Sequence, residues 1–252
     1  MKMEQAIYNR TALLVGDKAM EAFAAARVII FGVGGVGSWC AEGLLRSGVT
    51  HITLVDSDKV SATNVNRQEM ATTLTVGRVK VEALRERLLE INPSADIKAI
   101  QAVYCEETSS RFDLDSYDYV VDAIDSLKDK MHLILKASAS SAKLFSAMGA
   151  ALKIDPTRIR VAEFWSVRGC PLASAIRKRF RQNHTLPSKE FMCVYDDEVL
   201  PNRGTLQEED SLDSNRTGST SKAVINGTMA HITAIFGFTL SGLILQDITA
   251  RC

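Results

Sequence analysis

VIIFGVGGVG, residues 28–37, joins four large apolar residues to the glycine pattern G-x-G-x-x-G. The apolar run predicts a buried strand over residues 27–31, and the spacing that follows predicts a helix over residues 36–46. Glycines at this junction let the backbone approach a phosphate, while the helix N-terminus supplies N–H donors and a positive dipole end. The glycines expected around the phosphates are Gly32, Gly34, Gly35 and Gly37.

A second apolar run, residues 51–55, ends on Asp56, about twenty residues beyond the glycines. An acidic residue at this spacing accepts hydrogen bonds from ribose hydroxyls in nucleotide-binding folds. The combination predicts an adenine nucleotide, and it leaves ATP, NAD and FAD open.

Strands and helices alternate over the first half of the chain. Further strands are predicted over residues 97–103, 119–123 and 144–148, and helices over residues 76–91 and 128–142. This alternation predicts a Rossmann-like, doubly wound α/β fold with a mainly parallel sheet. We expect one domain over residues 1–252, with a nucleotide-binding core (1–150) and a substrate and dimer extension (151–252).

The second half is less regular. A strand pattern over residues 158–166 predicts a smaller antiparallel extension, and a helix is expected over residues 171–181. Polar residues 201–221 predict a mobile loop. The apolar segment 224–245 matches a membrane span in length, but its polar residues favour a helix in the core or at a subunit interface.

Composition excludes several classes of protein. The formal net charge is zero, so no global field attracts nucleic acid or an anionic membrane. The five cysteines include no C-x-x-C pair, which argues against a disulfide framework and a tetrahedral zinc site. The first ten residues lack the apolar core of a signal peptide. We therefore expect a cytoplasmic protein with no membrane partner.

Polar motifs around the glycine loop separate ATP from NAD. They are DSD (56–58), NVNRQ (64–68), GRVK (77–80) and DAID (122–125), with Arg10 upstream. Nucleotidyl transfer places negative charge on phosphate oxygens, which cations stabilise, whereas hydride transfer needs no such set. Alone, Arg67 or Lys80 would be a solvated charge, and Asp125 a helix N-cap.

These motifs, in this order, resemble the adenylation domain of the ubiquitin-activating superfamily, whose bacterial members include the ThiF and MoeB proteins. The resemblance spans roughly residues 8–248. It implies that Asp56 holds the ribose, that Arg67 and Lys80 counter charge at the α-phosphate, and that Asp125 binds Mg²⁺. It also implies that Arg10 reaches the ATP of the neighbouring subunit in a homodimer. The implied ATP-binding side chains are Asp56, Asp58, Asn64, Arg67 and Lys80.

Within that superfamily, the stretches GVGGVGSW (32–39), DAIDS (122–126), IDPT (154–157), CVY (193–195) and AIFGF (234–238) resemble the tRNA threonylcarbamoyladenosine dehydratases. The resemblance implies tRNA as substrate, adenylation of a threonyl carboxylate by ATP, ring closure with release of AMP, and an association with a cysteine desulfurase and sulfur-acceptor system. No enzyme cysteine is required. One departure is SAMGAA (146–151), which replaces an expected glycine-rich stretch and could alter the acceptor pocket.

A basic strip offers a contact for tRNA. Residues 164–189 contain no Asp or Glu, and the cations considered for phosphate contact are Arg177, Lys178, Arg179 and Arg181. The alternative is a solvated face of an amphipathic helix.

Three other functions remain open from the residues. The same chemistry could activate the C-terminus of a ubiquitin-like sulfur-carrier protein. The glycine loop and Asp56 alone would also fit an NAD-dependent oxidoreductase, and a protein that binds ATP without releasing AMP would be a nucleotide sensor.

Overall fold

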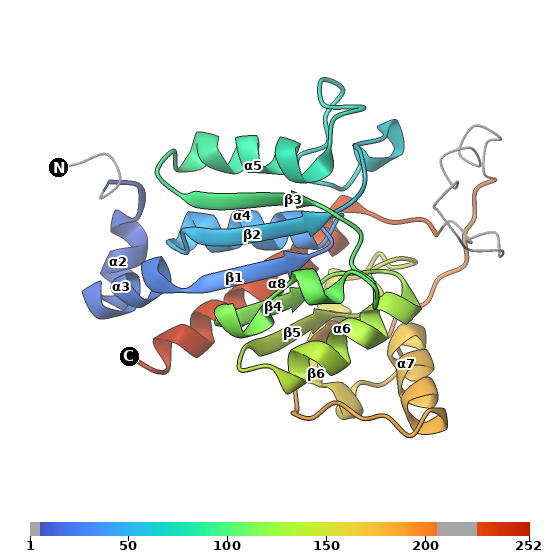
Figure 1. The fold of residues 1–252 in the computed structure, drawn as a ribbon. Coiled ribbons are helices and arrows are strands. Elements are labelled where there is room, and N and C mark those ends of the chain that lie inside the picture. The colour runs from blue at the N-terminus through green and yellow to red at the C-terminus, as the bar shows by residue number, and fades with distance from the viewer. Residues whose placement is uncertain (1–5, 206–225) are drawn as a thin grey trace.

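The computed structural model describes residues 6–205 and 226–252, which build a seven-stranded sheet with helices on both faces (Figure 1). The strand order is β3-β2-β1-β4-β5-β7-β6. The strands are β1 (Arg27–Phe31), β2 (His51–Asp56), β3 (Asp96–Gln101), β4 (Tyr119–Asp122), β5 (Lys143–Ala147), β6 (Arg160–Glu163) and β7 (Met192–Tyr195). The longer helices are α2 (Asn9–Val15), α3 (Asp17–Ala25), α4 (Gly37–Ser47), α5 (Lys80–Ile91), α6 (Leu127–Ala139), α7 (Pro171–Gln182) and α8 (Ala230–Thr249).

The sheet is parallel except at one edge. β1 pairs in parallel with β2 and β4, and the parallel series continues through β5 to β7. Only β6 runs antiparallel, against β7. The predicted doubly wound sheet with a smaller antiparallel extension is therefore confirmed.

Two hydrophobic layers sandwich the sheet. On one face, α3, α4, α5 and α8 pack against inward residues such as Val28 and Ile30 of β1. On the other face, α6 and α7 pack against the alternate residues Ile29 and Phe31. Burial on both faces explains why β1 reads as a continuous apolar run.

α8 packs along α4 on one face of the sheet (Figure 1). A Cβ on Gly237 would lie 2.5 Å from the Val36 carbonyl oxygen, so only glycine permits this backbone approach. By length and composition α8 could cross a membrane, yet Phe236, Leu240 and Ile244 are fully buried in the core. The expectation of a core helix is confirmed, and its role at a subunit interface stays a prediction.

Several predicted boundaries differ. α5 begins at Lys80 instead of residue 76, because Gly77 takes a left-handed conformation (φ 88°) and Val79 forms a bridge with Lys59. The strand expected over 158–166 is only four residues long, because 3-10 turns form on both sides of β6. The sequence analysis missed α2, α3 and β7. Of the predicted loop 201–221, residues 206–221 lie outside the described residues, and residues 201–205 form neither helix nor strand.

Candidate functional site

The strand order creates a topological switch point at the carboxyl ends of β1 and β4, where a ligand-binding crevice is expected. The chain passes from β1 to β2 on one side, and after β3 it returns to β4 on the other side of β1. Neighbouring loops diverge at such a topological switch point, where open α/β sheets bind ligands. The glycine loop, Asp56 and residues 122–125 follow β1, β2 and β4 at this edge.

Two glycines make the loop fold tightly here. Gly32 has a φ of 84°, and a Cβ at that position would lie 2.7 Å from the Ala123 carbonyl oxygen. A Cβ on Gly37 would lie 1.9 Å from the Gly32 carbonyl oxygen. Gly34, in contrast, meets only the Gln68 side chain at 3.8 Å. The first and last glycines therefore shape the turn, while Gly34 leaves its backbone open to approach by a phosphate.

Asp56 holds the glycine loop against the next segment. Its Oδ2 accepts a hydrogen bond from the Val33 backbone N–H at 2.9 Å, and its Oδ1 accepts one from the Asp58 backbone N–H at 2.9 Å. Each ionised carboxylate oxygen can accept about two hydrogen bonds. A ribose hydroxyl can therefore bind without displacing either backbone contact.

Lys80 is the first residue of α5, and its side chain is only 4% exposed. Its Nζ lies 3.0 Å from Oδ2 of Asp58, whose side chain is 32% exposed. A buried ammonium needs a compensating charge, which Asp58 provides. Asp58 therefore accepts a hydrogen bond from Nζ of Lys80. The other two Nζ hydrogens can be donated to acceptors that enter the crevice.

The segment that follows β2 positions Arg67 and Asn64. Nη1 of Arg67 donates to the Thr63 carbonyl at 2.7 Å and to Oδ1 of Asn66 at 2.9 Å. The Asn64 side chain is buried and accepts the Ser61 backbone N–H at 3.1 Å. This turn carries the motif NVNRQ as one folded unit beside the glycine loop.

Contacts to the Arg67 backbone were not foreseen from the sequence. The indole Nε1 of Trp39 on α4 donates to the Arg67 carbonyl at 3.0 Å, and Oγ1 of Thr233 on α8 donates to the same oxygen at 3.4 Å. Two distant helices therefore fix the position of this arginine. A tryptophan two residues after the glycine pattern gives no local signal of such a partner.

Asp125 lies on the loop between β4 and α6, and it is exposed. The alternative reading of Asp125 as a helix cap is wrong, because Ser126 is the N-cap: its Oγ accepts the Asp129 backbone N–H at 3.5 Å.

The neighbouring Asp122 belongs to a different arrangement. Its Oδ2 lies 2.9 Å from Nζ of Lys130, and both side chains are 0% exposed. Lys130 also donates to the Ile124 carbonyl at 3.0 Å, and Ser146 donates to Asp122 at 2.7 Å. This buried ion pair holds the backbone that leads to Asp125. Neither Lys130 nor Ser146 was predicted to take part.

The donor set at this edge fits Mg²⁺. Magnesium usually binds proteins through one or two carboxylates together with substrate phosphates. Asp125 supplies an exposed carboxylate beside the glycine loop, whereas Asp122 is neutralised by Lys130. Asp125 would therefore hold the ion, and the phosphates of the nucleotide would complete its coordination.

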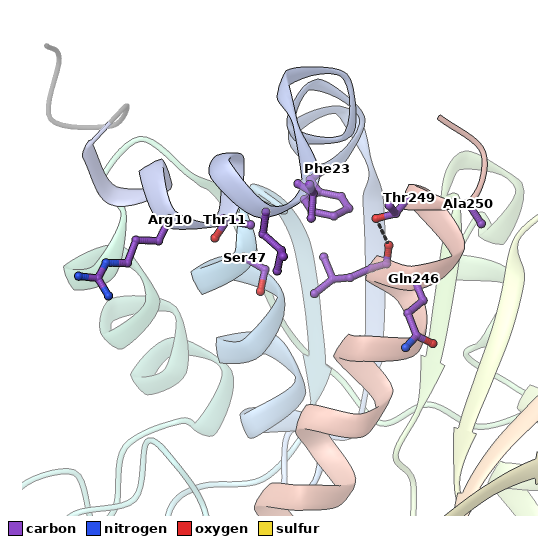
Figure 2. A pocket seen from close by; sticks show the side chains of 10 residues that line it. Arg10, Thr11, Phe23, Ser47, Gln246, Thr249 and Ala250 are labelled. Carbon is purple, nitrogen blue, oxygen red and sulfur yellow. Dashed lines mark hydrogen bonds between the residues drawn. The ribbon is translucent and has the colours of Figure 1, made fainter.

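Arg10 lies far from this crevice. It is on α2, at the end of the sheet where β1 begins, opposite the end that carries the glycine loop (Figure 1). There it lines a largely apolar cavity of about 680 Å³ with residues of α3, α4 and α8. In Figure 2, the Arg10 guanidinium points away from Gln246 and Thr249 on α8. A single chain does not bring Arg10 together with Arg67, Lys80 and Asp125.

The stretch 146–151, where a glycine-rich segment was expected, begins inside β5. Ser146 and Ala147 are buried inside β5, so only the end of this stretch can reach the crevice.

All five cysteines are free thiols. Burial raises the pKa of Cys40 and of Cys193 well above the ordinary range, and a protonated thiol is a poor nucleophile.

A carboxyl pair lies behind the glycine loop. Glu69 follows the motif NVNRQ, and its side chain is 4% exposed. Burial and the hydrogen bond that the protonated Glu69 carboxyl donates to Glu42 raise the pKa of Glu69 to about 7, although Arg87 lies 2.9 Å from its Oε1. For Glu42, burial alone would raise the pKa, but hydrogen bonds from Glu69 and Arg46 lower it. The two carboxyl groups thus share a proton at mildly acidic pH.

This pair makes stability depend on pH. Because folding raises the pKa of Glu69, its contribution is fully present below the unfolded value near 4.5 and is lost as pH rises through about 7. The free energy of unfolding of the wild type should fall by on the order of 2 kcal/mol between pH 5 and pH 8, and Glu69→Gln should abolish this fall. Urea unfolding at several pH values measures both. Glu90→Gln, which changes the exposed partner of Arg87, is the matched control. An identical pH profile for wild type and Glu69→Gln would contradict this assignment.

The basic strip lies on α7 and is not uniform. Arg177 is half-buried, and Lys178, Arg179 and Arg181 are exposed. Ile176 and Phe180 face the core, as an amphipathic helix requires. RNA contact by these four residues stays a prediction.

Comparison with known proteins gives one consistent picture. The family model described as "ThiF family" matches residues 8–250. The tRNA threonylcarbamoyladenosine dehydratase of Bacillus subtilis is 39% identical over 191 residues, which cover 76% of this chain and 74% of that protein. The Escherichia coli molybdopterin-synthase adenylyltransferase is 31% identical over 178 residues, with 70% and 69% covered.

A solved structure shares the whole fold. The crystal structure of the Escherichia coli tRNA N6-threonylcarbamoyladenosine dehydratase, TcdA, in complex with ATP matches with a TM-score of 0.85 at 31% identity. The match covers all of this chain and 97% of that one.

Proposed function

This chain belongs to the ThiF family, and from that premise we propose that it is an ATP-dependent dehydratase acting on threonylcarbamoyladenosine in tRNA. The observation that carries the proposal is the convergence of a phosphate-binding glycine loop, Lys80 and Asp125 at one edge of the sheet. The named relatives with the higher identities act on tRNA, which favours this acceptor over a sulfur-carrier protein.

In the proposed complex, Asp56 accepts hydrogen bonds from the ribose of ATP, and the glycine loop donates backbone N–H groups to the phosphates. Lys80 and Arg67 place positive charge at the α-phosphate, where negative charge develops as the leaving pyrophosphate departs. Asn64 and Asp58 complete the nucleotide site, Asp58 by holding Lys80 in place. Asp125 would hold a magnesium ion, which would supply further electrostatic stabilisation to the phosphates.

The first chemical step activates a carboxylate. A carboxylate is a poor electrophile because its leaving group would be oxide. An oxygen of the threonyl carboxylate attacks the α-phosphorus, the bond to the β-phosphate oxygen breaks, and pyrophosphate leaves. The product is a mixed anhydride of the threonyl carboxyl group and AMP.

The second step closes the ring. A nucleophilic atom of the same modification attacks the activated carbonyl carbon and loses a proton, and AMP leaves with the former carboxylate oxygen. Counted from the neutral carboxyl group, that oxygen with the carboxyl proton and the proton lost by the nucleophile makes up the one water that is removed. Because the nucleophile is tethered to the carbonyl, proximity supplies much of the rate, and no enzyme cysteine is needed. The burial of Cys40, Cys170 and Cys193 agrees with this scheme.

We propose that Arg10 contributes to the ATP site of the second subunit in a homodimer. Since Arg10 lies at the far end of its own sheet, it can serve only the ATP of a second subunit. Three large apolar side chains are exposed on these helices: Leu13 and Leu14 on α2, and Phe238 on α8. Exposed apolar side chains suit a homodimer interface. We propose this assembly for the cytoplasm, with a cysteine desulfurase and sulfur-acceptor system as its further partners.

The decisive experiment is mass spectrometry of nucleosides from tRNA that carries threonylcarbamoyladenosine. With the purified protein, Mg²⁺ and ATP, we expect the modified nucleoside to lose the mass of one water, with AMP and pyrophosphate formed in step. Without ATP, the nucleoside should stay unchanged. An unaltered nucleoside in the presence of ATP would contradict the proposal.

Three control reactions distinguish the alternatives. Pyrophosphate exchange that requires a protein ending in Gly-Gly would identify an activator of a sulfur carrier. ATP binding without AMP release would identify a sensor, and a change in nicotinamide absorbance with an alcohol would identify an oxidoreductase.

A further inference from the structure

Three arginines gather around two aromatic rings where β6 leads into α7. Nη1 of Arg177 donates to the Phe164 carbonyl at 2.9 Å, and its guanidinium carbon lies 5.8 Å from the Phe164 ring centroid. The Arg181 guanidinium carbon lies 5.7 Å from the centroid of the Trp165 ring. Arg168 donates to the Trp165 carbonyl at 2.7 Å.

These like charges lack a counter-charge. Within residues 6–205 and 226–252, no carboxylate forms an ion pair with any of the three arginines. Glu163, the acid nearest to Arg168 along the chain, accepts the Trp165 backbone N–H at 2.7 Å, and its Oε1 is buried. Burial lowers the pKa of Arg177, and the charges of Arg168 and Arg181 lower it further. Mutual repulsion here favours an anion as the missing partner.

The basic strip on α7 therefore divides in two. Arg177 and Arg181 are four residues apart and share one helix face, beside Trp165 and Arg168. Lys178 and Arg179 are turned about 100° and 200° around the helix from Arg177, so they face elsewhere. Only the first group combines cations with an aromatic ring.

We propose that Arg168, Arg181 and Trp165 form a contact site for tRNA, in which the two arginines bind backbone phosphates and the indole stacks on an unpaired base. Arg177 is the positioning residue, because its guanidinium bonds to the Phe164 backbone and supports the two rings. Cations beside an aromatic face are the combination by which proteins bind single-stranded nucleic acid. This inference rests on the proposed function, since it names the surface that receives the proposed substrate.

The site lies within reach of the crevice. α7 begins at Pro171, and the Leu172 Cβ lies 3.8 Å from the position of a Cβ on Gly149, just past the end of β5. Arg181 is ten residues along the helix, or about 15 Å. At about 3.4 Å per stacked nucleotide, this distance corresponds to roughly four nucleotides. A tRNA loop whose modified adenosine enters the crevice can therefore place the neighbouring nucleotides on this surface.

The test compares two double variants by tRNA binding over a range of salt concentrations. Arg168→Ala/Arg181→Ala should weaken binding about tenfold or more and reduce the slope of log K against log[salt] by roughly 1.4, or about 0.7 for each lost phosphate contact. Lys178→Ala/Arg179→Ala removes the same number of positive charges, both from α7, and should weaken binding by less than about threefold. Unfolding midpoints and ATP affinity check that each variant is folded.

Trp165 provides an independent readout. Trp165→Ala should weaken binding about tenfold, whereas Trp165→Phe, which retains an aromatic face, should recover most of that loss. Equal losses in the two double variants, or full affinity in Arg168→Ala/Arg181→Ala, would overturn the site. If such a variant binds normally while the wild type dehydrates the nucleoside, this inference alone fails. If the wild type neither binds tRNA nor forms product, both fail.

Discussion

Lys80→Ala should lower ATP-to-AMP turnover by about 1,000-fold or more while the protein stays folded. The Lys80 side chain is only 4% exposed, and an arginine finger, which likewise places a positive charge on the phosphoryl group in the transition state, contributes about 10³–10⁵ to the rate. Its partner Asp58 is 32% exposed, so water can solvate the carboxylate that remains. The loss should therefore appear in turnover, measured as AMP release, and only weakly in stability.

Two comparisons make this result specific. Lys59→Ala removes an exposed lysine from the same segment and should keep near-normal turnover. Asp125→Asn should lower turnover strongly and raise the Mg²⁺ concentration needed for half-maximal rate, since an amide oxygen binds Mg²⁺ more weakly than a carboxylate. Full turnover by folded Lys80→Ala and Asp125→Asn would refute the proposed site.

The second large effect concerns stability. Lys130→Met should lower the free energy of unfolding by about 3–5 kcal/mol, because it leaves the 0% exposed Asp122 as an unpaired buried charge. Urea unfolding followed by circular dichroism measures the change. The matched control is Lys136→Met on the same helix, where the lysine is not buried, and there we expect a change within about 0.5 kcal/mol.

A double-mutant cycle isolates the pair. Lys130→Met/Asp122→Asn removes both charges, keeps an acceptor for the Ser146 hydroxyl, and should recover at least about half of the lost stability. Strict additivity of the two single losses would mean that the charges are not coupled. Since the pair binds both the N–H and the carbonyl of Ile124, the neutral pair should also show reduced turnover through a less ordered Asp125.

The predictable part of the fold follows from local patterns. β1, β2, β4 and β5 are nearly continuous apolar runs because helices cover both of their faces. β7, by contrast, is four residues long, and its insertion between β5 and β6 leaves no periodic signal. α2 and α3 were also missed; they are short, α2 buries no residue, and α3 buries only Ala19 and Phe23.

The candidate site likewise contains residues that local sequence identifies and residues whose role depends on tertiary contacts. Gly32, Asp56, Lys80 and Asp125 could be selected because each follows directly from a strand end or a helix start. Arg10 could also be selected by resemblance, but its place at the opposite end of the sheet was visible only in three dimensions. For Asp58, the tertiary structure supplied a specific role as the partner of Lys80.

By itself the sequence determined the edge of the sheet at which we propose that the nucleotide binds. A buried strand, a glycine turn and an acidic strand end are all encoded within short stretches of chain. Only the tertiary structure decided the partnerships of Asp122 with Lys130 and Ser146, and of Trp165 with Arg168 and Arg181. Those contacts depend on which strands and helices become neighbours, and charges that repel or neutralise one another reveal their relation only when their distances are known.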